Sequence, residues 1–142
     1  MKTRVSNGKE QIYCEWRHRW VRLTPEEWVR QQLLHRMVSE LEYPASLIAV
    51  ETAISVGEAK KRCDAVVYNR RMLPLLLIEC KAETVPLTQK TLDQIVTYNR
   101  KLNVPYLLLH NGPQTLFVTT EQNGTNTITQ RLPRYTDLLR GE

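Results

Sequence analysis

The segment LLLIECK, residues 75–81, decides which fold this sequence predicts. Its nearly continuous aliphatic run is typical of a strand that is covered on both faces of a sheet. Side chains alternate along a strand, so Glu79 and Lys81 project from one face and Cys80 from the other. A satisfied ion pair at the end of a buried strand would explain these charges, but their burial is costly unless a partner or an ion offsets it. The segment therefore predicts a central strand whose charged end is a candidate functional site.

Strand and helix signals alternate on both sides of this segment. Runs of β-branched and aliphatic residues favour strands, whereas apolar residues at helical spacing follow Thr24 and Thr88, which are suitable N-caps. The expected elements are a helix over residues 24–42, strands over 47–54, 62–68 and 75–81, a helix over 88–103, a strand over 106–110, and a hairpin of 116–119 with 127–130. This order predicts an α/β fold.

The length and composition fit one globular domain. The chain has 142 residues, of which 42% are hydrophobic and 25% charged, and we expect a flexible N-terminal segment over residues 1–11 followed by a single domain over 12–142. Residues 12–23 are expected to form an edge strand or an extended arm.

Several function classes are excluded by what the sequence lacks. Its glycines are scattered singly, without the spacing of a phosphate-binding loop or a dinucleotide fingerprint. Three cysteines without a C-x-x-C pair argue against a zinc site and a disulfide framework, and no apolar run approaches a membrane span. We therefore expect a soluble protein of the cytoplasm with no membrane contact. The net charge of +5 permits contact with a polyanion without proving it.

Two carboxylates are expected to meet at the end of the central strand. Asp64 lies on the preceding strand, and a short hairpin through residues 69–73 would bring it beside Glu79. Mg²⁺ prefers oxygen ligands. The site would supply two carboxylates and the backbone carbonyl of Cys80, and water and phosphate oxygens would complete the shell. Lys81 would then lie where an ammonium orients a water molecule or offsets charge on a phosphate.

These residues resemble the D…(D/E)-x-K core of the PD-(D/E)xK nuclease superfamily. The match is Asp64 followed by Glu79-x-Lys81, and Gln94-x-x-x-Tyr98 is similar to the Q-x-x-x-Y motif of the RecB-like branch. That motif also occurs in the N-terminal nuclease domain of type I restriction enzyme R subunits. Without the upstream motif, Gln94 and Tyr98 would be interpreted as a polar pair on an exposed helix face.

The resemblance covers most of residues 12–118 and includes residues 24–31 (TPEEWVRQ), which are similar to the opening helix of the R-subunit domain. In that family the helix supplies an acid near the metal. Glu27 is slightly favoured over Glu26 here, but both are equally explained as first-turn partners of the helix dipole. The sequence departs from the pattern in having no proline before Asp64, and the helicase motor of such enzymes is absent.

The resemblance implies an αβββαβ core with a mixed central sheet flanked by helices, and Mg²⁺-dependent hydrolysis of DNA with Mn²⁺ as a substitute. It assigns metal binding to Asp64, Glu79 and the Cys80 carbonyl, water activation to Lys81, support of the metal to Glu27 or Glu26, and a hold on the site or the DNA backbone to Gln94 and Tyr98. The expected partners are DNA and other restriction-system subunits, such as a motor or specificity protein. The alternative is a non-catalytic DNA-binding or assembly module of a restriction, defence or mobile-element system.

Basic residues near these motifs are candidates for DNA contact. Lys61 and Arg62 lie just before Asp64, and Arg30 lies on the first helix, although a charge run is more often a solvated turn. A second candidate set interleaves arginines with tryptophans, which an ordinary edge strand explains about as well; it comprises Arg17, Arg19, Arg22, Trp16 and Trp20. Glu51 could face the site, but an acid on an amphipathic strand is more often solvated.

Overall fold

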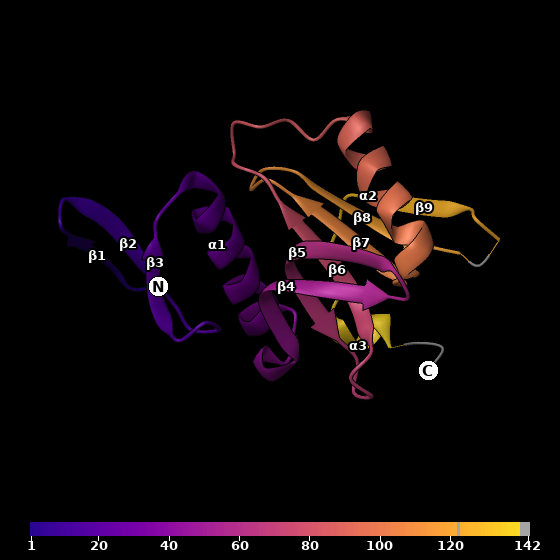
Figure 1. Cartoon of the computed structure of the whole chain (residues 1–142), viewed down its shortest axis with the longest axis horizontal. Helices are drawn as coiled ribbons and strands as arrows, with labels where there is room; N and C mark the ends of the chain where they lie inside the picture. Colours follow the sequence, from indigo (N-terminus) through magenta and orange to yellow (C-terminus); the bar gives the residue numbers. More distant parts are fainter. Residues whose placement is uncertain (122, 140–142) are drawn as a thin grey trace.

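The computed structural model describes residues 1–121 and 123–139, and the order of its elements matches the order expected from the sequence (Figure 1). The main body consists of α1 (Pro25–Glu40), β4 (Ile48–Val56), β5 (Ala59–Tyr68), β6 (Pro74–Cys80), α2 (Gln89–Leu102), β7 (Tyr106–His110), β8 (Thr115–Thr120) and β9 (Asn126–Thr129). Two short elements that the sequence did not predict are the 3₁₀ turn η1 (Ala45–Leu47) and the helix α3 (Tyr135–Leu138).

The strands of the main body form one mixed sheet in the order β4-β5-β6-β7-β8-β9. Among the described residues, β6 and β7 pair in parallel, and the other neighbours pair antiparallel. Parallel neighbours need a long crossover, which α2 supplies between them. The predicted α/β class and αβββαβ core are therefore confirmed.

The strand that carries the LLLIECK segment is buried on both faces. Leu76 and Ile78 of β6 pack in a cluster with α1 and α3, whereas Leu77 packs in a second cluster with α2. In Figure 1, α1 and α2 lie on opposite sides of the sheet. The end of β6 is thus held between two helices, and polar groups there are partly shielded from water.

Residues 1–11, which were expected to form a flexible segment, lie mostly in strands in the structure. Strands β1 (Thr3–Ser6), β2 (Lys9–Cys14) and β3 (Arg19–Arg22) form a separate antiparallel sheet, seen at the far left of Figure 1. Asn7 and Gly8 connect β1 to β2 with φ values of 51° and 74°, the backbone that a two-residue hairpin turn requires. Residues 12–23 accordingly divide between two strands instead of forming one.

The predicted start of the first helix is confirmed. The hydroxyl of Thr24 accepts a hydrogen bond from the backbone N–H of Glu27 at 3.1 Å, and Pro25 occupies the first helical position. This cap places Glu26 and Glu27 in the first turn, where the positive end of the helix dipole favours carboxylates. No helix among the described residues is both long and apolar enough to cross a membrane.

Candidate active site

Asp64 and Glu79 lie opposite each other at one end of the β5–β6 ladder. Ala65 pairs with Ile78, so the next antiparallel positions are Asp64 and Glu79. Asp64 Oδ2 accepts a hydrogen bond from the backbone N–H of Cys80 at 2.7 Å, which fixes its carboxylate against the end of β6. The hairpin thus brings together the two carboxylates that the sequence singled out.

Opposing effects act on the pKa of Glu79 in this position. Burial raises the pKa of its carboxyl and the negative charge of Asp64 adds to the effect, while the ammonium of Lys61, 3.0 Å from Oε1, opposes it. The same Oε1 is buried, and Lys61 is the cation that lies beside it. The pair therefore holds negative charge that the protein only partly offsets.

This pair has donors suited to a hard divalent cation. Carboxylate oxygens are the ligands that Mg²⁺ prefers, and it commonly completes its shell with water and phosphate oxygens. Within the described residues no group of three His, Cys, Asp or Glu side chains could hold a metal ion, so the remaining ligands would be carbonyl, water or phosphate oxygens. Burial raises the pKa of the Cys80 thiol, which disfavours the thiolate as a metal ligand.

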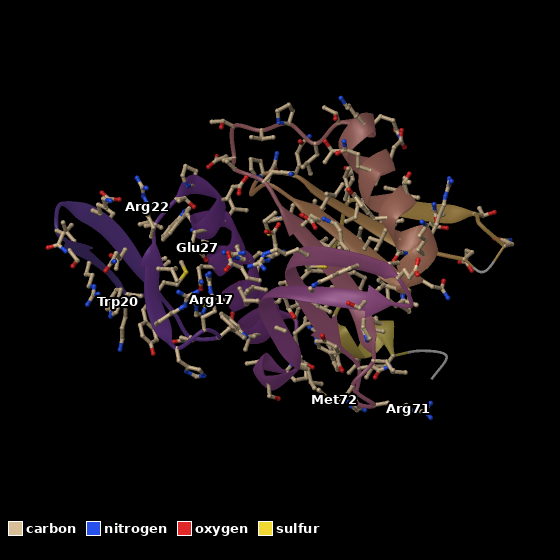
Figure 2. The ribbon with its side chains drawn as sticks, in the orientation of Figure 1. Arg17, Trp20, Arg22, Glu27, Arg71 and Met72 are labelled. Carbon is tan, nitrogen blue, oxygen red and sulfur yellow. The ribbon has the colours of Figure 1, made fainter. Side chains whose placement is uncertain are left out.

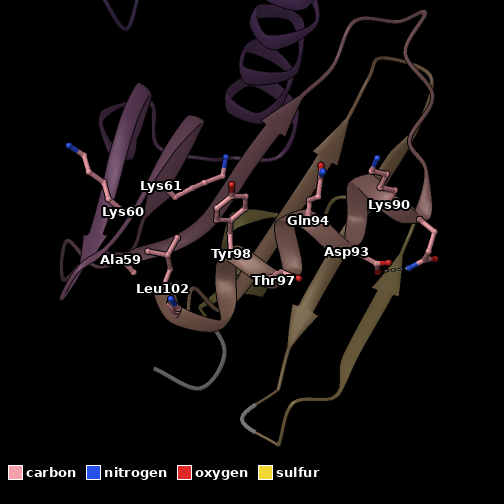
Figure 3. Close-up of a pocket in the computed structure, with 11 residues that line it drawn as sticks. Ala59, Lys60, Lys61, Lys90, Asp93, Gln94, Thr97, Tyr98 and Leu102 are labelled. Carbon is pink, nitrogen blue, oxygen red and sulfur yellow. Dashed lines mark hydrogen bonds between the residues drawn. The ribbon is translucent and has the colours of Figure 1, made fainter.

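Lys81, Gln94 and Tyr98 lie on the same side of the sheet as Glu79. Together with Glu79 they line a cavity of about 80 Å³ between the end of β6 and α2. Tyr98 is 55% exposed, and the ammonium of Lys61 lies 5.0 Å from the centre of its ring, as Figure 3 shows. Gln94 and Tyr98 thus share a cavity with two of the motif residues, Glu79 and Lys81.

On the other side of the sheet, Glu27 is the centre of a buried ion network. It accepts hydrogen bonds from both Arg30 and Gln31, and its Oε1 lies 2.7 Å from Arg17 Nη2 (Figure 2). Burial acts to raise the pKa of Glu27, but these hydrogen bonds outweigh it and hold the pKa below its ordinary value. Glu27 is therefore a charged residue that fixes two arginines.

Glu26 has the opposite environment. It is exposed and lines a cavity of about 470 Å³ with Asp64, whereas Glu27 is engaged by its arginines. The two acids that the sequence could not separate thus have distinct settings. Both line this cavity, but the carboxylate of Glu27 is held by Arg17 and Arg30, and Arg30 links it to Asp64.

A comparison with family models decides what this arrangement belongs to. Residues 25–133 match the model of the type I restriction enzyme R protein N terminus (HSDR_N). The chain belongs to this family. The predicted resemblance to the R-subunit domain is thereby confirmed.

Solved structures show the same fold in relatives of this R-protein N-terminal domain. A fragment of a candidate HsdR subunit of a type I restriction enzyme from Vibrio vulnificus YJ016 superposes with a TM-score of 0.59 and 20% identity, over 82% of this chain and 24% of that one. A candidate DUF820 nuclease from Anabaena variabilis ATCC 29413 superposes with a TM-score of 0.50 and 10% identity, over 89% and 80% of the two chains. The domain thus spans about a quarter of the HsdR fragment. A comparison with curated proteins finds no match.

The R-protein N-terminal domain does not present Arg30 to DNA as the sequence suggested. The side chain of Arg30 is 8% exposed, because it lies among Glu27, Glu51 and Asp64. Its Nη1 is 3.6 Å from Asp64 Oδ1 and also donates to the Asp64 carbonyl at 3.5 Å. Arg30 is therefore a positioning residue for Asp64.

The other two predicted DNA contacts, Lys61 and Arg62, have different surroundings. Lys61 is turned toward Glu79, so its charge is engaged inside the site. Arg62 is 72% exposed, with Glu51 at 3.8 Å, and remains available to a phosphate. Along β3, Arg19 and Arg22 are exposed, whereas Arg17 points inward to Glu27.

Glu51 contributes more to the site than its position in the sequence indicated. Its neighbours Val50 and Thr52 pair with Ala65 and Cys63, so Glu51 faces Asp64 at an interruption of the ladder. Its φ of 49° is unusual for a non-glycine residue and is a form of strain found at functional sites. Glu51 Oε2 lies 3.3 Å from Arg17, which ties β4 to the network. An acid within an aliphatic strand was the visible signal, but the sequence does not show the left-handed backbone.

The raised pKa of Glu79 makes a prediction about stability and pH. A buried acid whose folded pKa is raised lowers the free energy of unfolding as pH rises from 4.5, its ordinary value, through the folded pKa. Without metal, Glu79→Gln should therefore raise the melting temperature by roughly a few degrees at neutral pH and leave it unchanged in acid below the ordinary carboxyl range. Thermal unfolding monitored by circular dichroism across this pH range measures the difference.

The matched control is Glu58→Gln, a substitution in the exposed β4–β5 turn, which should shift the melting temperature at neither pH. A lower melting temperature for Glu79→Gln at neutral pH would show that the Lys61 ion pair outweighs burial and the repulsion from Asp64. That result would contradict the electrostatics described above.

Proposed function

We propose that this R-protein N-terminal domain hydrolyses phosphodiester bonds in DNA, with Mg²⁺ held by Asp64, Glu79 and the carbonyl of Cys80. The observation that supports this most strongly is the facing pair of carboxylates, of which Glu79 shares a cavity with Lys81. Family membership supports a nuclease-related role. When bound, the metal would supply Lewis acidity and a more acidic water.

The chain's own residues would position the reactants. In hydrolysis, water forms a new P–O bond and the bond from phosphorus to one ester oxygen breaks, so no oxidant or reductant is needed. The Lys81 ammonium would orient the attacking water and offset charge that builds on the phosphate oxygens. Glu27 would hold Arg30, which in turn holds Asp64 at 3.6 Å. Glu26 would support the metal's water shell from the cavity in front of Asp64.

DNA is the proposed substrate because the family is that of a restriction enzyme subunit. The exposed Arg62 and the net charge of +5 suit a polyanion. Since the family is that of a type I restriction enzyme subunit, we further propose that a motor or specificity protein of a restriction system works with it. Its three free, buried cysteines suit the reducing cytoplasm.

A second candidate function is a non-catalytic DNA-binding or assembly module. The observation that favours it is the Lys61–Glu79 ion pair, which already partly neutralises the carboxylate that a metal would need. Against it stands the retention of Asp64, Glu79 and Lys81 together.

The test is cleavage of a supercoiled plasmid. Parent protein with Mg²⁺ should convert the plasmid to nicked or linear forms, because an ion between the carboxylates enables hydrolysis. Excess EDTA should stop the conversion, and Asp64→Asn should reduce it by roughly a thousandfold. Cleavage that persists in EDTA or in Asp64→Asn would contradict the proposal, and a parent that binds the plasmid without cutting it would favour the non-catalytic module.

A further inference from the structure

A lysine-rich groove runs beside α2, next to the candidate site (Figure 3). Its volume is about 870 Å³, and it lies between α2 and the start of β5. The described residues that line it include four lysines and one acid; these are Lys60, Lys61, Lys90, Lys101 and Asp93. The groove therefore has an excess of positive charge.

Three of these lysines are free to bind an anion. Lys60, Lys90 and Lys101 are exposed, and none forms an ion pair with a residue that the structure describes. The single acid, Asp93, accepts a hydrogen bond from Gln89 at 2.9 Å on the same helix. The groove therefore carries lysines without an ion-pair partner among the described residues, whereas the arginines around Glu27 are paired with carboxylates.

The groove adjoins the small cavity that contains Glu79. Lys61, Gln94 and Tyr98 line both the groove and the small cavity that contains Glu79 and Lys81. An extended ligand that passes along the groove would thus arrive at Glu79. The exposed ring of Tyr98 lines the groove and offers an aromatic face that suits sugars and bases.

Its length fits several nucleotides. Lys90, Gln94, Thr97 and Lys101 recur at intervals of three and four, so they lie on one helix face. At 1.5 Å per residue, the eleven steps from Lys90 to Lys101 span roughly 16 Å. One strand of B-DNA advances about 3.4 Å along the duplex axis per nucleotide, and its winding backbone takes a longer path, so the groove could follow a few phosphates.

We propose that this groove binds the sugar–phosphate backbone of the DNA strand that continues beyond the scissile phosphate. The inference rests on the proposed function, because it takes Glu79 as the point where the phosphodiester arrives. An acidic protein segment would also suit the charge. DNA fits better because the groove adjoins Glu79, whose carboxylate would repel an acidic peptide but receive a phosphodiester together with its cation.

The test compares two double variants that lose the same charge. Lys90→Gln/Lys101→Gln removes two groove lysines, and Arg70→Gln/Arg71→Gln removes two exposed arginines from the β5–β6 turn, far from the groove in Figure 2, where Arg71 is labelled. A fluorescein-labelled DNA duplex is titrated with each protein in EDTA, and its anisotropy is recorded at several salt concentrations. The groove variant should bind about tenfold more weakly, and the slope of log affinity against log salt should fall by about 2, since each lost phosphate contact removes about 0.9. The turn variant should bind within about twofold of the parent.

Equal weakening in both variants would show that only net charge matters, and unchanged binding by the groove variant would show that DNA lies elsewhere; either result overturns the inference. Because the assay contains no metal and scores no cleavage, its outcome is separate from that of the proposed function. A domain that cuts no DNA can still bind it through the groove, and a domain that cuts can still lack this contact.

Discussion

Lys81→Ala is expected to slow plasmid cleavage by roughly a hundredfold to a thousandfold while leaving DNA affinity within about twofold of the parent. The ammonium of Lys81 would act on water and on charge that develops only as the phosphate reacts. It shares the small cavity with Glu79, whereas phosphate binding is spread over many basic residues of the surface. Single-turnover cleavage in Mg²⁺, together with anisotropy titrations in EDTA, separates the two effects.

Lys9→Ala is the control, because Lys9 is an exposed lysine at the start of β2 in the separate N-terminal sheet. It should cut and bind as the parent does. If Lys81→Ala also cut at the parent rate, Lys81 would have no part in the chemistry. If it lost DNA binding in proportion to cleavage, its role would be binding.

Glu27→Gln is expected to lower the free energy of unfolding by about 3 kcal/mol, because it removes the nearest carboxylate from two buried guanidinium groups and leaves them the longer contacts to Glu51 and Asp64. The side chains of Arg17 and Arg30 are 11% and 8% exposed, and Glu27 pairs with both. Loss of its charge leaves two cations that water cannot reach well. Urea unfolding at neutral pH measures the change.

The pH dependence of this loss has a defined sign. The pKa of Glu27 is held below its ordinary value of 4.5, so its stabilising effect is present above that value and fades as the pH falls through the lower, folded value. The difference between parent and Glu27→Gln should therefore shrink in acid. Glu26→Gln is the matched control, since Glu26 is exposed one position away and its loss should change stability by only about 0.5 kcal/mol. Equal losses for the two variants would refute the buried network.

The local signals in the sequence were enough to predict most of the fold. The cap at Thr24, the aliphatic run of β6 and the helical spacing along α2 each reflect interactions between near neighbours, and the structure confirms them. The Asn7-Gly8 pair is also a turn signal in the sequence, but the residues around it are mostly polar and do not indicate a hairpin. The helix α3 is four residues long and owes its place to packing, including a hydrogen bond from the Tyr135 hydroxyl to the Tyr68 carbonyl, which no local pattern reveals.

Only the part of the candidate site that a hairpin brings together could be predicted from the sequence. Asp64 and Glu79 meet because an antiparallel ladder joins their strands, and strand alternation together with loop length is enough to infer that. The orientation of Arg30 and Arg17 depends on how α1 and the chain after β2 pack against Glu51. Such contacts join residues that are distant in sequence. The pattern of charges in the sequence therefore suggested that Arg30 binds DNA, whereas in the fold Arg30 forms ion pairs inside the protein.

The central claim is that Asp64 and Glu79 together hold a divalent cation, and isothermal titration calorimetry with Mn²⁺ tests it most directly. Two carboxylates held close repel each other, and a divalent ion relieves that repulsion. The parent domain, free of DNA, should give a saturable binding isotherm, and the double variant Asp64→Asn/Glu79→Gln should give none. An isotherm from the double variant that matches the parent's would place the metal elsewhere and contradict the account.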